Sequence, residues 1–279
     1  RDAGVVVTPT GAILITTFTS LAYETQLQKA LAVPDSWDAS RLARWRGAHD
    51  RIGESQRQAA LGTWMTRSDD VGVSWSRRYD SLVNSPHGPI VTRKGRLLYA
   101  GVSLWRTDRR IGVVESKDDG RSWEWVGDIP TRDGDSSSDY HELHMVESSN
   151  GTLVTHIRNH NAKNSGETLQ SESTDGGKTW TAPHSIGVWG LPSHLLKLRD
   201  DRLLMSYGHR RAPFGNQARV SDNGGKTWSD PMTISADGNA GDLGYPSTVE
   251  LSNGALLTVW YERLAGSTRA VLRQARWSL

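Results

Sequence analysis

A glutamate and a tyrosine, far apart in the sequence, form the first pair of residues that could do chemistry. Glu142 stands in HELHMVE and Tyr245 in GYPSTVEL. A phenol with a pKa of about 10 is a weak nucleophile, but a neighbouring carboxylate that accepts its proton makes it a strong one. A neutral tyrosine also attacks an anionic sugar without the repulsion that a carboxylate nucleophile would meet. The pair suggests chemistry on an acidic glycoside, although an aromatic side chain that fills the inside of the fold explains Tyr245 equally well.

Three arginines could bind the acidic group of such a substrate. Arg158 stands in THIRNHN, and Arg210 and Arg211 stand together in YGHRRAPFG. A planar guanidinium group donates two parallel hydrogen bonds to a carboxylate or phosphate. We expect at least one of the adjacent pair to contact a surface acid instead.

A repeated sequence motif indicates how residues so far apart in the sequence are brought together. Each copy reads Ser-x-Asp-x-Gly-x-Ser/Thr-Trp, with Asn in place of Asp in the last, and the starts lie 48, 57 and 48 residues apart. We expect a hairpin turn, in which the Asp or Asn bonds the backbone of the turn, the glycine takes a positive φ and the tryptophan packs beneath. The four copies are Ser68 to Trp75, Ser116 to Trp123, Ser173 to Trp180 and Ser221 to Trp228.

A second repeat, out of phase with the first, places a turn residue before an apolar strand in GAILITTF, GRLLYAG, GTLVTHIR, DRLLMSYG and GALLTVWYE. Together the repeats give strand, turn, strand, strand, turn, strand, which is one four-stranded antiparallel blade. Blades repeated at this period predict an all-β fold, a β-propeller, as one domain over residues 1–279. We count five blade cores, near residues 3–75, 87–123, 141–180, 194–228 and 245–279.

The first blade contains an insertion. From about residue 24 to 60 the sequence is rich in Gln, Ala, Arg and Leu, which favours helices, and Pro34 interrupts it. We expect this helical segment to cap the channel or to pack at its rim.

The inner strand of each blade lines the central channel, and about eight residues before each turn residue this strand is polar. These positions predict a polar ligand pocket at one mouth of the channel. They are occupied by Arg1 and Asp2, by His87, by His141, Glu142 and His144, by His194, and by Tyr245.

Composition excludes several other classes of protein. The net charge is +2 with both signs interspersed, which argues against a nucleic-acid partner. Cysteine is absent, so disulfides, thiol catalysis and Cys-ligated zinc are excluded. No apolar run approaches the length of about 20 residues of a membrane span, and the first residues lack the layout of a signal peptide. The histidines lack a metal-binding spacing, so we expect neither a metal nor another cofactor.

With these repeats and segments, the sequence resembles the sialidase (neuraminidase) superfamily with its Asp-box (BNR) repeats. The resemblance covers nearly the whole chain and implies a six-bladed propeller, of which five blades are visible. It also implies an exo-glycosidase that removes terminal sialic acid with retention, outside the cytoplasm. YHELHMVESSNGTLVTHIRNHN resembles the segment with the glutamate that assists the nucleophile and a triad arginine, and GDLGYPSTVELSNGALLTVWYE resembles the segment with the nucleophile. The resemblance assigns Tyr245 as nucleophile, Glu142 as its partner, and Arg1, Arg158 and Arg210, or Arg211, as carboxylate ligands.

The acid that protonates the leaving group is left open. In the superfamily it lies in the loop where this chain has its insertion, so Glu24, Asp35, Asp38 and Asp50 all qualify.

Two alternatives compete with a sialidase. We add three histidines to the predicted substrate site, namely His87, His144 and His194. These three, like His141 and His209, are not part of the sialidase pattern. They favour a lyase or a non-sialic glycosidase with imidazole as acid and base. The other alternative is a non-catalytic carbohydrate-binding propeller, because the fold alone does not fix the activity.

Overall fold

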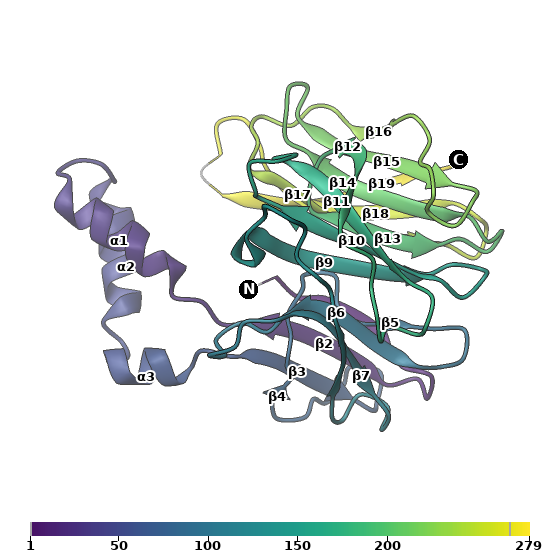
Figure 1. Ribbon diagram of the computed structural model, residues 1–279. Helices are drawn as coiled ribbons and strands as arrows, with labels where there is room; N and C mark the ends of the chain where they lie inside the picture. Colours follow the sequence, from purple (N-terminus) through teal and green to yellow (C-terminus); the bar gives the residue numbers. More distant parts are fainter. Residues whose placement is uncertain (1, 268) are drawn as a thin grey trace.

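The protein is a five-bladed β-propeller (Figure 1), seen in a computed structural model that describes residues 2–267 and 269–279. Each blade is an antiparallel sheet whose strands follow one another in chain order. The inner strands of neighbouring blades lie side by side, as β9 does with β13 and β13 with β17. The described residues form five sheets, so the expectation of six blades is not confirmed.

Four blades have the predicted four strands. Blade 1 contains β1 (Gly4–Val7), β2 (Ile13–Phe18), β3 (Thr63–Ser68) and β4 (Tyr79–Asp80). Blade 2 contains β5 (Ile90–Val91), β6 (Leu97–Val102), β7 (Ile111–Ser116) and β8 (Glu124–Asp128). Blade 3 contains β9 (Tyr140–Glu147), β10 (Leu153–Asn159), β11 (Glu167–Ser173) and β12 (His184–Trp189), preceded by a short 3-10 helix at Ser137–Asp139. Blade 4 contains β13 (Ser193–Lys197), β14 (Leu203–His209), β15 (Gly215–Ser221) and β16 (Met232–Ser235).

Blade 5 has three strands in the described part of the chain. They are β17 (Leu243–Glu250), β18 (Leu256–Arg263) and β19 (Ala270–Trp277). Its outer strand alternates between partly buried and exposed side chains, as a strand does with one face toward solvent.

Three helices lie between β2 and β3 and stand to one side of the propeller (Figure 1). They are α1 (Ala22–Ala32), α2 (Ala39–His49) and α3 (Glu54–Ala59). Asp38 caps α2 by accepting a hydrogen bond from the backbone N–H of Arg41 at 2.8 Å. Glu24 on α1 pairs with Arg57 on α3 at 2.7 Å, so the helices are bound to one another.

The four repeated turns have the predicted hydrogen bonds. In the turn of blade 2, Asp118 accepts bonds from the hydroxyl of Ser116 at 2.8 Å and from the backbone N–H and hydroxyl of Ser122 at 2.8 and 2.6 Å. Gly120 has φ +90°, which an L side chain rarely adopts. The turn is thus set by its own side chains and its glycine.

The tryptophans that end these turns differ in burial. Trp123 and Trp180 are buried, and Trp228 is partly buried. Trp75 is 41% exposed, so the prediction that the tryptophan packs beneath the turn is wrong for blade 1. The indole N–H of Trp75 still donates to the carbonyl of Gly72 at 3.1 Å, so the bond within the turn is kept without burial.

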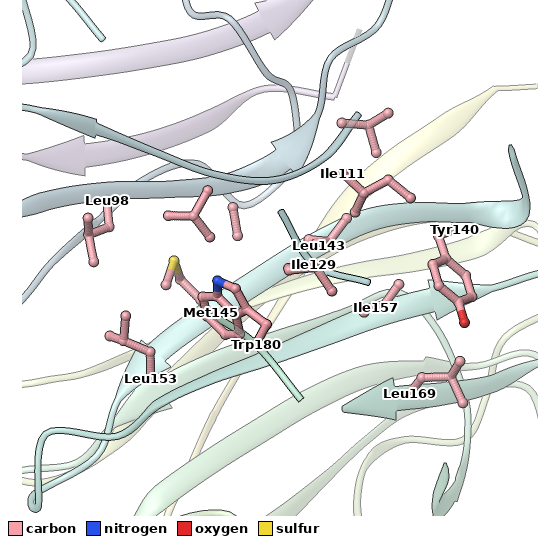
Figure 2. Close-up of a cluster of buried hydrophobic side chains, with 13 residues drawn as sticks. Leu98, Ile111, Ile129, Tyr140, Leu143, Met145, Leu153, Ile157, Leu169 and Trp180 are labelled. Atoms are coloured by element: carbon pink, nitrogen blue, oxygen red, sulfur yellow. The ribbon is translucent and has the colours of Figure 1, made fainter. Parts of the chain in front are cut away.

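Apolar side chains fill the space between neighbouring blades. Figure 2 shows the cluster between blades 2 and 3, in which Leu98 and Ile111 face Leu143, Met145 and Ile157. Burial of such side chains is worth about 1.5–3 kcal/mol each. Pairwise packing of this kind fixes one blade against the next and holds the inner strands in place.

Candidate functional site

Glu142, Arg158 and Tyr245 meet at one end of the channel, as the sequence predicted. The Tyr245 hydroxyl donates to Glu142 Oε1 at 2.5 Å. Arg158 Nη1 donates both to Glu142 Oε2 at 2.6 Å and to the Tyr245 hydroxyl oxygen at 3.0 Å. Tyr245 and Glu142 come from blades 5 and 3, so the ring of blades brings together residues 103 positions apart.

Two β-bulges turn Glu142 and Tyr245 toward each other. The pairing of β9 with β10 slips between His156 and Arg158, which leaves an extra residue on β9. The pairing of β17 with β18 slips in the same way between Gly244 and Ser247. Glu142 and Tyr245 have φ +40° and +53°, a region that non-glycine residues seldom occupy. A bulge re-aims a side chain, and such strain concentrates at functional sites.

The phenol is held neutral, with its hydrogen directed at Glu142. Burial and the negative charge of Glu142 raise the pKa of Tyr245 far above its ordinary value, while Arg158 acts in the opposite direction. A neutral phenol with its hydrogen aimed at a carboxylate is the arrangement needed for a base-assisted tyrosine nucleophile.

Two histidines adjoin this cluster. His160 Nε2 accepts from Arg158 Nε at 2.8 Å, and the rings of His141 and His160 have centroids 4.9 Å apart. Burial lowers the pKa of both, and that of His141 falls to about 4, so His141 is neutral near pH 6. The sequence prediction did not single out His160, although its position two residues after Arg158 in the same strand end was a usable signal.

Arg210 contributes a second guanidinium group. Its Cζ lies 5.7 Å from the centre of the Tyr245 ring. Its Nε and Nη2 atoms are buried, and no hydrogen-bond partner for them occurs in the described part of the chain. Buried guanidinium donors without a partner are costly unless a ligand accepts their bonds.

Arg211 has a different position. Its Cζ lies 3.6 Å from the centre of the Trp189 ring, in a cation–π contact. Arg211 is engaged by Trp189 and does not line the cavities that contain Tyr245, so its role in substrate binding stays a prediction. Arg1, the remaining predicted carboxylate ligand, lies outside the described residues.

A cavity of about 450 Å³ opens beside the cluster. It is the size expected of a small-ligand site. Blades 1 and 2 supply apolar and aromatic side chains together with the polar Asp2, Asn84 and Ser85, and blades 3 and 5 supply its other polar side chains. Its lining includes Phe18, Trp105, His141, Glu142, Arg158 and Tyr245.

The predicted histidines His87, His144 and His194 cluster together on the axis. Their ring centroids lie 5.0, 5.2 and 4.6 Å apart. They line a different cavity, also of about 450 Å³, and His87 alone of the three also lines a third cavity, which it shares with Tyr245. Their assignment to the substrate site is corrected for His144 and His194, which do not line the cavities that contain Tyr245.

Burial lowers the pKa of these three histidines, to about 4 for His194, so they are neutral. His144 Nδ1 accepts from the backbone N–H of Leu195 at 2.8 Å, which leaves its proton on Nε2. A histidine that binds a metal through Nε2 usually donates from Nδ1 instead. In residues 2–267 and 269–279 no three acidic or histidine side chains are arranged to hold a metal ion.

The acids of the insertion lie on the helices and their connecting segments. Glu24 contacts His49 and Arg57, and Asp38 caps α2. Asp35 follows α1, is exposed and has a left-handed backbone conformation. Asp50 lies at the end of α2. None of these four lines the cavity beside Tyr245. No helix in the described part of the chain is long and apolar enough to cross a membrane.

The fold and this cluster define a propeller with a tyrosine, a carboxylate and arginines at one mouth of its channel. The model of the BNR repeat-like domain matches residues 49–258, and the chain belongs to this family. The resemblance to the sialidase-like propellers with BNR repeats is thereby confirmed. A search of curated proteins finds no match.

Solved structures share the fold. A protein of unknown function from Dyadobacter fermentans is similar over 100% of this chain and 76% of its own, with a TM-score of 0.77 and 22% identity. The NanB sialidase of Streptococcus pneumoniae matches 77% of this chain and 35% of its own, with a TM-score of 0.60 and 20% identity. A GH93 α-L-arabinofuranosidase of Fusarium graminearum matches 100% of this chain and 80% of its own, with a TM-score of 0.60 and 16% identity.

Proposed function

We propose that the protein is a retaining exo-glycosidase that removes a terminal sugar bearing a carboxylate, of the sialic acid type. The observation that carries this proposal is the hydrogen bond of 2.5 Å from Tyr245 to Glu142, with Arg158 bound to both. Proteins of this fold include glycosidases that act on sialic acid and on arabinose. The natural substrate would be a glycan outside the cytoplasm.

The reaction would proceed in two displacements. The Tyr245 oxygen attacks the anomeric carbon and its proton passes to Glu142, while the bond to the leaving oxygen breaks. Water then attacks the same carbon from the side of the leaving group, the bond from that carbon to the Tyr245 oxygen breaks, and the released Tyr245 oxygen takes back its proton from Glu142. Arg210, and Arg158 in part, would bind the substrate carboxylate through the planar fork of the guanidinium group.

A panel of fluorogenic glycosides tests this proposal. We expect release from the α-sialoside, with the first product of retained configuration by NMR, and no effect of a chelator. Tyr245→Phe should lose nearly all turnover and keep substrate binding by calorimetry. Unchanged turnover in Tyr245→Phe would rule out the tyrosine mechanism.

A second candidate is a glycosidase on a neutral sugar, such as an arabinofuranoside. The observation that favours it is the engagement of Arg158, whose Nη1 and Nε are already bonded to Glu142, Tyr245 and His160. In that case Glu142 itself would be the nucleophile, and Tyr245→Phe would be mild. Release of product from the arabinofuranoside but not from the sialoside would select this candidate. A product that absorbs ultraviolet light would indicate a lyase. Binding of a glycoside without product would indicate a carbohydrate-binding propeller.

A further inference from the structure

Asp2 occupies the same position in blade 1 that Glu142 and Tyr245 occupy in blades 3 and 5. All three stand nine residues before the glycine of the turn that ends the inner strand. All three also have a left-handed backbone, with φ +50° at Asp2, +40° at Glu142 and +53° at Tyr245. Since non-glycine residues rarely adopt this conformation, its repetition at one position in three blades indicates a shared way of directing a side chain to the mouth of the channel.

The cavities confirm that Asp2 reaches the same site. Asp2 lines the cavity that also contacts Glu142, Arg158 and Tyr245. It also lines a neighbouring cavity, of about 420 Å³, together with Tyr245 and Tyr261. Burial is the main cause of the raised pKa of both tyrosines, and the charge of Asp2 adds to it. Asp2 is therefore near enough to Tyr245 to act on the same bound sugar.

A second carboxylic acid is what the cluster still requires. Glu142 accepts a hydrogen bond from Tyr245 and is bound by Arg158, so it is not available to protonate the leaving oxygen. The acids of the insertion are on the helices and do not line the cavity. Among the described residues that line it, Asp2 and Glu142 are the two that carry a carboxyl group.

We propose that Asp2 is the general acid and base at the leaving group, in place of an acid from the insertion. This inference rests on the proposed glycosidase function and holds for either sugar. In the first displacement the Asp2 carboxyl gives its proton to the glycosidic oxygen as the bond from that oxygen to the anomeric carbon breaks. In the second, the Asp2 carboxylate removes a proton from the attacking water, which restores the acid.

The test compares two leaving groups on whichever sugar the wild-type protein accepts. One substrate has an alkyl leaving group, as in a disaccharide, and the other a nitrophenol, which leaves without protonation. In Asp2→Asn we expect kcat/KM to fall at least 100-fold on the alkyl glycoside and less than 5-fold on the nitrophenyl glycoside. Azide should raise turnover of the nitrophenyl glycoside by the variant and give the glycosyl azide of retained configuration.

Asp242→Asn is the matched control. Asp242 is another carboxylate near this mouth, and it accepts the hydroxyl proton of Tyr261 at 2.8 Å. Its replacement removes the same charge and should leave the dependence on the leaving group as in the wild type. Thermal unfolding of both variants shows that they are folded.

The outcomes separate the two proposals. A wild-type protein inactive on every glycoside refutes the proposed function. If the wild type is active and Asp2→Asn loses equal activity on both leaving groups, or loses none, the role of Asp2 is overturned. The proposed glycosidase function is then unaffected.

Discussion

At the scale of single residues, the two adjacent arginines differ in what they can do for a ligand. Arg210 has buried Nε and Nη2 donors that no described residue accepts, whereas Arg211 lies against Trp189. A charge-assisted hydrogen bond is worth about 1.5–3 kcal/mol. We expect Arg210→Gln to raise KM for the anionic glycoside roughly 10- to 100-fold with a smaller change in kcat, as measured by initial rates.

Arg211→Gln is the natural control for that prediction because it removes an adjacent charge of the same kind. It should change KM less than about 3-fold, since its guanidinium group lies against Trp189 and does not line the cavity beside Tyr245. Equal effects of the two substitutions would contradict the assignment of the carboxylate site to Arg210.

The carboxylate of Glu142 should matter to the rate more than to binding. Glu142→Gln keeps an acceptor for the Tyr245 hydroxyl but cannot take its proton. General-base assistance is worth about 10²- to 10⁴-fold, so we expect kcat to fall by that factor while KM changes little. A kcat within 5-fold of the wild type, in a variant with unchanged thermal unfolding, would show that Glu142 is not the base.

At the scale of the strands and turns, the repeated hairpins form contacts between neighbouring blades. The turn of blade 2 contacts blade 1 through the Arg67–Asp119 ion pair at 2.8 Å. A Cβ at Gly120 would lie within 3.1 Å of both methyl groups of Leu14, which is fully buried in the cluster between these blades. The turn therefore supports both the hairpin and the interface.

We expect Gly120→Ala to destabilise the protein by more than its backbone strain alone. The left-handed φ costs about 1–2 kcal/mol and the overlap with Leu14 about 1–3 kcal/mol more. Gly151→Ala is the control, because Gly151 has φ +86° with open space around its Cβ position, and it should cost about 1–2 kcal/mol. Urea unfolding measures the difference, and equal costs would show that the turn does not pack on blade 1.

The sequence predicted the blades and the meeting of Glu142 with Tyr245 for the same reason. A repeat at fixed spacing puts equal positions at equal places on a ring, so Glu142 and Tyr245 could be grouped without coordinates. It did not predict the bulges, which depend on how β9 pairs with β10 and β17 with β18. In a regular strand Glu142 and His144 would share one face, and the bulge at Glu142 separates them. For this reason the sequence grouped His144 with Glu142, although His144 lines a different cavity.

At the scale of the whole molecule, buried histidines should make the fold sensitive to mild acid. His87, His144 and His156 are buried and His194 is partly buried, and burial lowers the pKa of His156 and His194 to about 4. In the unfolded chain each would titrate near pH 6.5. Between pH 6.5 and 4 the unfolded state thus binds more protons, so the free energy of unfolding falls as the pH falls.

Each such histidine contributes a slope of up to about 1.4 kcal/mol per pH unit in this window and none above it. The carboxylates of the repeated turns affect stability in a lower pH range. Hydrogen bonds from Ser74 and Ser68 hold the pKa of Asp70 at about 2, so the contribution of Asp70 to stability is lost below about pH 4. Urea unfolding at pH 5, 6 and 7 should therefore show a steep loss of stability toward pH 5. His156→Gln should flatten the profile by about one histidine's share. A flat wild-type profile would mean that these imidazoles are not buried in the folded protein.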